Sequence, residues 1–344
     1  MEIGIDSFAG ARLDKNTREY IDPAKDMNQL LERIAFADEM KLDSFFIGEH
    51  YQKEFLDSAH AVILGAAAAI TKNIRLGSGV TVLSSSDPVR VFQNFATLDL
   101  ISGGRAEIVA GRGSFTDSFP LFGFDLQDYG DLFEEKLKLL LKIRESEFVN
   151  WSGKFRSPLN NQPVYPRPVQ KELPIYRGVG GTTSSFIKAG VQGLPLVVAV
   201  IGGETERFRP LVDLYKQAYE DAGHAKEKMK IVLHSLGFVG VNDQEAKDSY
   251  FPGYAQMFDH VGEQRGWPKV TRAGYDAQTS YSGALVVGDP TSVADKILRH
   301  SKALGGIDRF TFNMDNPMLS HKDFLNCIKL IGEEVIPRIK DRQL

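Results

Sequence analysis

The sequence predicts an α/β protein with a single (β/α)8 barrel (TIM barrel) domain over residues 1–344 and an insertion at about 243–281, near its C-terminal end. Three observations lead to this prediction. Strand-like and helix-like segments alternate along the whole chain, which favours a parallel sheet covered by helices. No GxGxxG motif follows the first strand, which counts against a doubly wound sheet. No linker or fixed-period repeat divides the 344 residues, of which 42% are hydrophobic, enough for a large core.

The expected strands have the short apolar or alternating patterns that strands require. They are residues 3–8, 44–47, 74–83, 108–110, 174–179, 194–201, 231–239 and 309–314. Segments with apolar residues at helical spacing lie between them and after the last one. These expected helices are residues 26–40, 61–70, 87–102, 131–148, 183–191, 204–221, a helix that begins at 289–290, and 321–338.

Residues 74–113 show the strand–helix–strand unit most clearly. Asp87-Pro88 combines an N-cap side chain with a proline suited to the first helical turn. Gly103-Gly104 ends the helix, and the next strand runs into Gly111-Arg112-Gly113. Arg112 therefore lies at the carboxyl end of a strand, where α/β folds keep their sites. The predicted apolar face of the helix consists of Val91, Phe92, Phe95, Leu98 and Ile101.

Two segments depart from the alternation of strands and helices. Residues 151–171 are rich in Pro, Asn and Gly, so we expect a surface excursion without a regular element. Residues 243–281 are polar, aromatic and irregular in pattern, and we expect a helical insertion there. Its aromatic residues Trp267, Tyr275 and Tyr281 are candidates for lining the substrate side of a site.

Composition excludes several classes of protein. The net charge is −4 with acids and bases interspersed, so we expect neither nucleic acid nor a membrane surface as partner. The apolar run at 59–70 is too short to span a bilayer. The first residues, MEIGIDSF, enter a strand pattern directly, so we expect no secretory signal and a cytoplasmic location. The single cysteine, Cys327, has the setting of a small buried hydrophobe rather than a reactive thiol.

A histidine follows the second strand. His50 stands next to Glu49 at the expected catalytic rim, and imidazole titrates near neutral pH, so both residues are candidates for catalysis. The alternative is a structural histidine bonded to a backbone group. The other histidines show no metal-ligand spacing, no HExxH or CxxC motif is present, and we expect no metal.

Residues 180–185, GGTTSS, follow the fifth strand and open a helix. Free N–H groups at a helix N-terminus, with glycines and hydroxyls beside them, make an anion site. Arg112 on the neighbouring strand would add a bidentate contact to a phosphate group. Ordinary turn and cap chemistry is the alternative for the glycine-threonine segment taken alone.

Glycines interrupt the third strand at Gly77-Ser78-Gly79. Glycine weakens a strand unless another backbone or a flat ligand must approach closely. A β-bulge is the alternative explanation, and the pattern alone does not decide between them.

These residues carry a resemblance to a known family. The chain resembles the luciferase-like flavin-dependent monooxygenases, relatives of the bacterial luciferase α-subunit. The matching segments are GEHY at 48–51, the whole of 74–113, GGTTSSFIKAGVQGLPLVVAVIGG at 180–203 and VVGDPTSVADKI at 286–297.

The resemblance implies a (β/α)8 barrel that binds FMN, or the deazaflavin F420, at its carboxyl rim. It assigns His50 to the active-site histidine and Glu49 to its neighbour under the ring. It places a non-prolyl cis peptide at Gly79-Val80, behind the ring. It assigns Arg112 and the turn of Gly180, Gly181, Thr182 and Ser185 to the phosphate group. The sequence departs from the family pattern in reading Glu-His-Tyr where Glu-His-His is usual, and the long loop of true luciferase is not recognisable.

The function expected from this resemblance is the oxygenase part of a two-component monooxygenase. Reduced FMN from a separate flavin reductase would react with O₂ to give a C4a-peroxyflavin that oxidises a small organic substrate, with His50 in acid–base work. An F420-dependent hydride-transfer enzyme, a non-catalytic flavin-binding relative and a barrel for another phosphate ester remain alternatives. The family also implies a homodimer, formed through the helices near 61–70.

Overall fold

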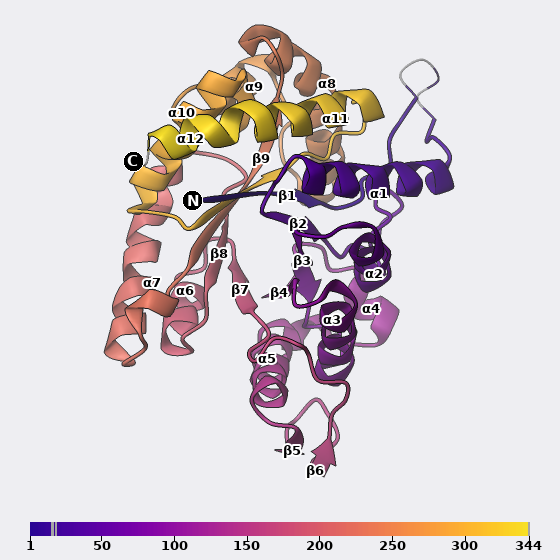
Figure 1. Ribbon diagram of the computed structural model, residues 1–344, viewed down its shortest axis with the longest axis vertical. Helices are drawn as coiled ribbons and strands as arrows, with labels where there is room; N and C mark the ends of the chain where they lie inside the picture. Colours follow the sequence, from indigo (N-terminus) through magenta and orange to yellow (C-terminus); the bar gives the residue numbers. More distant parts are fainter. Residues whose placement is uncertain (15–16, 18, 343–344) are drawn as a thin grey trace.

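The eight predicted strands form a closed parallel barrel in the computed structural model, which describes residues 1–14, 17 and 19–342 (Figure 1). They follow one another around the barrel in chain order, and β8 pairs with β9 to complete it. The prediction of a (β/α)8 barrel is therefore confirmed. The barrel strands are β1 (Glu2–Ser7), β2 (Ser44–Ile47), β3 (Arg75–Val82), β4 (Ala106–Gly111), β7 (Ile175–Val179), β8 (Leu196–Ala199), β9 (Ile231–Val239) and β11 (Arg309–Asn313). A short further strand, β10 (Val286–Gly288), pairs with the end of β9.

Helices surround this barrel. Asp87 and Asp289 cap α3 and α10 as the sequence predicts, each accepting a hydrogen bond from a backbone N–H of the first turn. The long helices are α1 (Pro23–Glu39), α2 (His60–Ile70), α3 (Pro88–Ser102), α5 (Tyr129–Glu145), α6 (Thr183–Val191), α7 (Arg209–Asp221), α10 (Pro290–Leu304) and α11 (His321–Leu330), which continues through a π-helical turn (Ile331–Val335) into α12 (Ile336–Asp341). The short ones are α4 (Ser118–Phe122) and the 3₁₀ segments Leu126–Asp128, Thr205–Phe208 and Lys226–Lys228.

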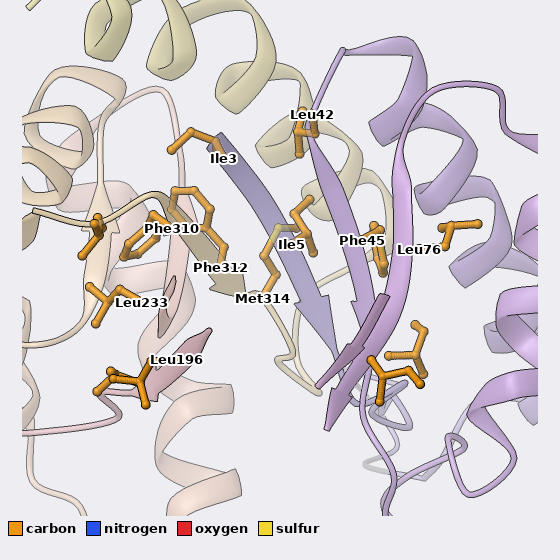
Figure 2. Close-up of a cluster of buried hydrophobic side chains, with 14 of the residues drawn as sticks. Ile3, Ile5, Leu42, Phe45, Leu76, Leu196, Leu233, Phe310, Phe312 and Met314 are labelled. Atoms are coloured by element: carbon orange, nitrogen blue, oxygen red, sulfur yellow. The ribbon is translucent and has the colours of Figure 1, made fainter. Parts of the chain in front are cut away.

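Alternation along the strands divides the side chains between two environments. Ile3 and Ile5 of β1 and Phe310 and Phe312 of β11 are at most 1% exposed and belong to one continuous apolar cluster with the surrounding helices (Figure 2). The intervening positions of the same strands point into the barrel. An apolar layer lies inside it, made by Phe46, Val109, Tyr176 and Val232. The buried ion pair of Arg309 and Glu107 lies at the amino ends of β11 and β4, and the Arg309 guanidinium packs on the Phe46 and Tyr176 rings of this layer. The cavity lining holds other polar residues of the barrel interior, Asp6, His234 and Thr311.

The prediction that residues 151–171 hold no regular element is wrong. An antiparallel hairpin begins just before this segment, formed by β5 (Phe148–Trp151) and β6 (Leu159–Pro163), and it extends beyond α5 (Figure 1). Val149 is fully buried, and Trp151 packs on the core. The strand at Phe148 also explains why α5 ends at Glu145, before the predicted residue 148.

The apolar face predicted for α3 is correct except at its last member. Val91, Phe92, Phe95 and Leu98 are buried, whereas Ile101 is 53% exposed. Residues 243–281 form α8 (Asp243–Arg265) and α9 (Arg272–Thr279), and the ring centroids of Tyr254 and Tyr275 from these two helices lie 5.2 Å apart.

Candidate active site

A cavity of about 800 Å³ lies at the carboxyl end of the barrel strands and reaches into the barrel. This volume is within the range of about 300–1,000 Å³ typical of small-molecule sites. Most of the residues proposed from the sequence line it. They are Glu49, His50, Gly79, Val80, Arg112, Gly180 and Gly181. Thr182 and Ser185 do not line this cavity and lie at the start of α6.

His50 is fixed by a carboxylate that the sequence reasoning missed. Asp57 accepts a hydrogen bond from the backbone N–H of His50 at 2.9 Å, and its second oxygen lies 2.8 Å from His50 Nδ1. Asp57 is fully buried, and burial raises the pKa of its carboxyl group against the opposing effect of the bonds to His50. Among the described residues none hydrogen-bonds to His50 Nε2. The pair therefore presents Nε2 as the reactive nitrogen.

Aromatic rings enclose the His50 imidazole. The ring centroids of Phe8 and Phe55 each lie 4.4 Å from it, and that of Phe115 lies 5.4 Å away. Phe8 and Phe115 also line the cavity. Such packing restricts the imidazole to one orientation and keeps water from it, as acid–base chemistry requires.

Glu49 lies at the cavity wall with both oxygens already bonded. One accepts a hydrogen bond from Val82 N at 2.7 Å, and the other accepts the hydroxyl of Tyr51. Burial, and then the neighbouring Glu49, raises the pKa of Tyr51. The tyrosine that replaces the family's second histidine thus serves as a hydrogen-bond donor to Glu49, and this carboxylate joins β2 to the end of β3.

Val80 lines the cavity, and its side chain packs against the backbone of two glycines, where a larger residue would collide with it. A Cβ atom at Gly111 would lie 2.6 Å from Val80 Cγ2, and one at Gly178 would lie 3.0 Å from Val80 Cγ1. The peptide bond between Gly79 and Val80 is cis, where the resemblance implied such a bond. The pairing register between β3 and β4 also shifts between Gly79 and Thr81, so a bulge is present at a position that lines the cavity.

Arg112 lines the cavity, as does Arg207. The Arg112 guanidinium lies 5.1 Å from the Tyr129 ring centroid, and no carboxylate of the described residues pairs with it. The backbone at Gly180 and Gly181 borders the same cavity, and no atom lies within 4 Å of a Cβ built on either glycine. An arginine without a carboxylate partner, in the same cavity as open backbone that leads into a helix, offers the donors that an anion binds.

Thr182 is the N-cap residue of α6, and its side chain makes no capping hydrogen bond. The N–H of Ser185 donates to the carbonyl of Thr182 at 2.9 Å. The structure thus brings Arg112 and the two glycines to the cavity and places the two hydroxyl residues beside it, in the first turn of the helix.

The aromatic residues of the insertion do not face this cavity, contrary to the sequence-based expectation. Tyr275 is buried, and its hydroxyl donates to the carbonyl of Lys247 at 2.9 Å. Trp267 and Tyr281 are 48% and 64% exposed. The Tyr275 ring packs instead on Phe251 and Tyr254 of α8, with ring centroids 5.1 and 5.2 Å away.

The described residues contain no cluster of three or more His, Cys, Asp or Glu side chains placed to hold a metal ion. Among the same described residues, no helix has both the length and the apolar character needed to cross a membrane.

Comparison with known proteins adds to this geometry. The alkanal monooxygenase alpha chain of Photobacterium leiognathi is 24% identical over 355 residues, covering 94% of this chain and 98% of that protein. The F420-dependent glucose-6-phosphate dehydrogenase of Microbacterium testaceum is 24% identical over 343 residues, covering 92% and 94%. The crystal structure of the monooxygenase RslO1 from Streptomyces bottropensis superposes with a TM-score of 0.84 at 21% identity, covering 98% and 99% of the two chains, and supports the fold.

The sequence profile of the family described as luciferase-like monooxygenase matches residues 1–307. Its members among the relatives are monooxygenases and F420-dependent oxidoreductases. The chain therefore belongs to the luciferase-like monooxygenase family and is an oxidoreductase of that family.

Proposed function

We propose that the chain is the oxygenase component of a two-component monooxygenase that uses reduced FMN, supplied by a separate reductase, and O₂ to oxidise a small organic substrate. Arg112 carries this proposal, because a guanidinium without a carboxylate partner lies in the same cavity as the open glycine backbone that leads into α6. These groups fit the phosphate of FMN. The wall at Gly79-Val80, with Val82 and Phe115 nearby, fits a flat ring.

The roles of the protein residues follow from their hydrogen bonds. Reduced FMN would supply the electrons that O₂ requires. His50 would hold or transfer a proton at Nε2, since Asp57 fixes Nδ1. Glu49 would position the end of β3 through its bond to Val82 N. The aromatic rings around His50 would exclude water from the reacting groups.

An F420-dependent hydride transfer is the second candidate. Its support is the similarity to an F420-dependent glucose-6-phosphate dehydrogenase along nearly the whole chain. The same anion site serves either cofactor, because both carry a phosphate group on a flexible chain. In this case His50 would exchange a proton with the substrate, and O₂ would not take part.

Titration of the purified protein with FMN and with F420 separates these candidates. Arg112→Met should weaken binding of the correct cofactor by about 10–100-fold, because a charge-assisted bond contributes about 1.5–3 kcal/mol. Arg209→Met is the matched control, since Arg209 is exposed and pairs with Asp213. Reoxidation of chemically reduced FMN by O₂ that is slower with the protein than without it supports the first candidate, because free reduced FMN reacts with O₂ by itself. Binding of F420 alone replaces the first candidate with the second. Failure to bind either cofactor contradicts both.

We also infer that the chain forms a homodimer through α2 and α3. Three apolar side chains on these neighbouring helices are largely exposed, namely Val62 (73%), Ile70 (51%) and Ile101 (53%). Exposed apolar side chains gathered on one face are typical of an interface. Val62→Glu with Ile101→Glu should give a monomer in light scattering, whereas Val241→Glu, at an isolated residue that is 83% exposed, should leave the mass unchanged. A monomeric wild-type protein would contradict this inference.

A further inference from the structure

A second histidine–carboxylate pair lies deeper in the same cavity. His234 of β9 bonds through Nδ1 to one oxygen of Asp6 on β1, and the hydroxyl of Thr311 on β11 donates to the same oxygen. β11 lies between β9 and β1, and Thr311 pairs in register with His234. Closure of the barrel therefore brings together residues that are 228 positions apart in the sequence.

Two atoms of this group remain without a partner. Asp6 is 3% exposed, and its other oxygen, Oδ1, is buried without a hydrogen bond. His234 Nε2 accepts no hydrogen bond from the described residues, and both side chains line the cavity. A purely structural network pairs its buried polar atoms, because each unpaired one costs about 1–3 kcal/mol. Asp6 Oδ1 is the buried atom that bears this cost, whereas His234 Nε2 belongs to a side chain that lines the cavity and can accept a hydrogen bond from a ligand there.

The pair lies beside the surface proposed for the ring. Asp6 Oδ1 is 3.6 Å from the position that a Cβ atom at Gly79 would occupy. Phe8 separates the two histidines, with ring centroids 4.4 Å from His50 and 6.2 Å from His234. The cavity thus holds two imidazoles, each fixed at Nδ1 by a buried carboxylate and each with Nε2 unpaired.

We propose that His234, held by Asp6, is a binding contact for an N–H group of the bound flavin or deazaflavin ring. This inference rests on the proposed function. In the tautomer whose only ring proton points from Nδ1 to the Asp6 carboxylate, the imidazole of His234 is an acceptor at Nε2. An acceptor at this position selects a ligand edge that donates a proton, and the imide N–H common to both kinds of ring is such a donor.

Histidine ring ¹⁵N spectra of the whole protein, with and without FMN or F420, test this contact. Addition of the cofactor that binds should shift the Nε2 resonance of His234 and leave that of His224 unchanged, since His224 lies on the outside against Val191. His234→Asn keeps a donor toward Asp6 and removes Nε2, so it should weaken cofactor binding about tenfold. His224→Asn is the matched control and should bind as the wild type does.

The outcomes separate this inference from the proposed function. If the wild-type protein binds a cofactor but the His234 resonance does not shift and His234→Asn binds equally well, the inference is overturned and the proposed function stands. If the wild-type protein binds neither cofactor, the proposed function fails and this inference fails with it. If His234→Asn does not fold, the wild-type spectra alone decide.

Discussion

Replacing Asp57 tests how the protein controls the active-site histidine. In Asp57→Asn the side-chain oxygen can still accept from His50 N, but the amide group donates to Nδ1 in place of accepting from it. The imidazole proton must then move to Nε2, which reverses the hydrogen-bonding character that His50 presents. General acid–base steps contribute about 10²–10⁴-fold to rates, and we expect a loss of substrate oxidation of that order.

Stability should follow a definite order. Asp57→Asn exchanges a charge-assisted bond for a neutral one and should lower the free energy of unfolding by about 1–2 kcal/mol. Asp57→Ala leaves two buried His50 groups unpaired and should lower it by about 2–6 kcal/mol, at about 1–3 kcal/mol each. Imidazole ¹⁵N spectra at pH 8 and urea unfolding measure both effects, with Asp213→Asn as an exposed control. An unchanged His50 tautomer in Asp57→Asn, or an alanine variant as stable as the wild type, would refute this reasoning.

Two further predictions concern packing and pH. Gly111→Ala places a methyl group 2.6 Å from Val80 and should lower the free energy of unfolding by about 1–3 kcal/mol and weaken cofactor binding. Gly130→Ala in α5, with open space around the added methyl group, should not lower it, and equal effects of the two substitutions would contradict the close packing of the cavity wall. Burial lowers the pKa of Lys296 from 10.5 to about 7. Between these two pH values the unfolded chain binds more protons at this group than the folded protein does. The group therefore makes the free energy of unfolding rise with pH across that window, by at most about 1.4 kcal/mol per pH unit. Unfolding of Lys296→Met between pH 7 and 9 should show a smaller rise than the wild type, and an equal or steeper rise would count against a neutral buried amine.

The sequence was sufficient for the barrel and for a part of the cavity wall. The strands and caps are local patterns, and Arg112 and Gly180 lie at strand ends that a parallel barrel must bring to one rim. The hairpin at β5 and β6 was missed because Pro, Asn and Gln occupy its exposed positions and its single buried anchor, Val149, gives no alternation.

Partners of the histidines were harder to identify. Adjacency suggested Glu49 for His50, but neighbouring residues of an extended chain point apart, and Glu49 bonds to Val82 while Asp57 reaches the imidazole. A carboxylate seven residues on, in the same loop, was the only local signal for Asp57. His234 and Asp6 could not be paired from the sequence, because only the register at barrel closure brings them together.

A crystal structure of the protein soaked with FMN tests the central claim most directly. The account predicts the phosphate within hydrogen-bonding distance of Arg112 and of the Gly180 and Gly181 backbone, the ring against Gly79-Val80, and His50 facing the ring. A phosphate bound away from Arg112, a ring outside this cavity, or the absence of FMN and equally of F420 from soaked crystals would contradict it.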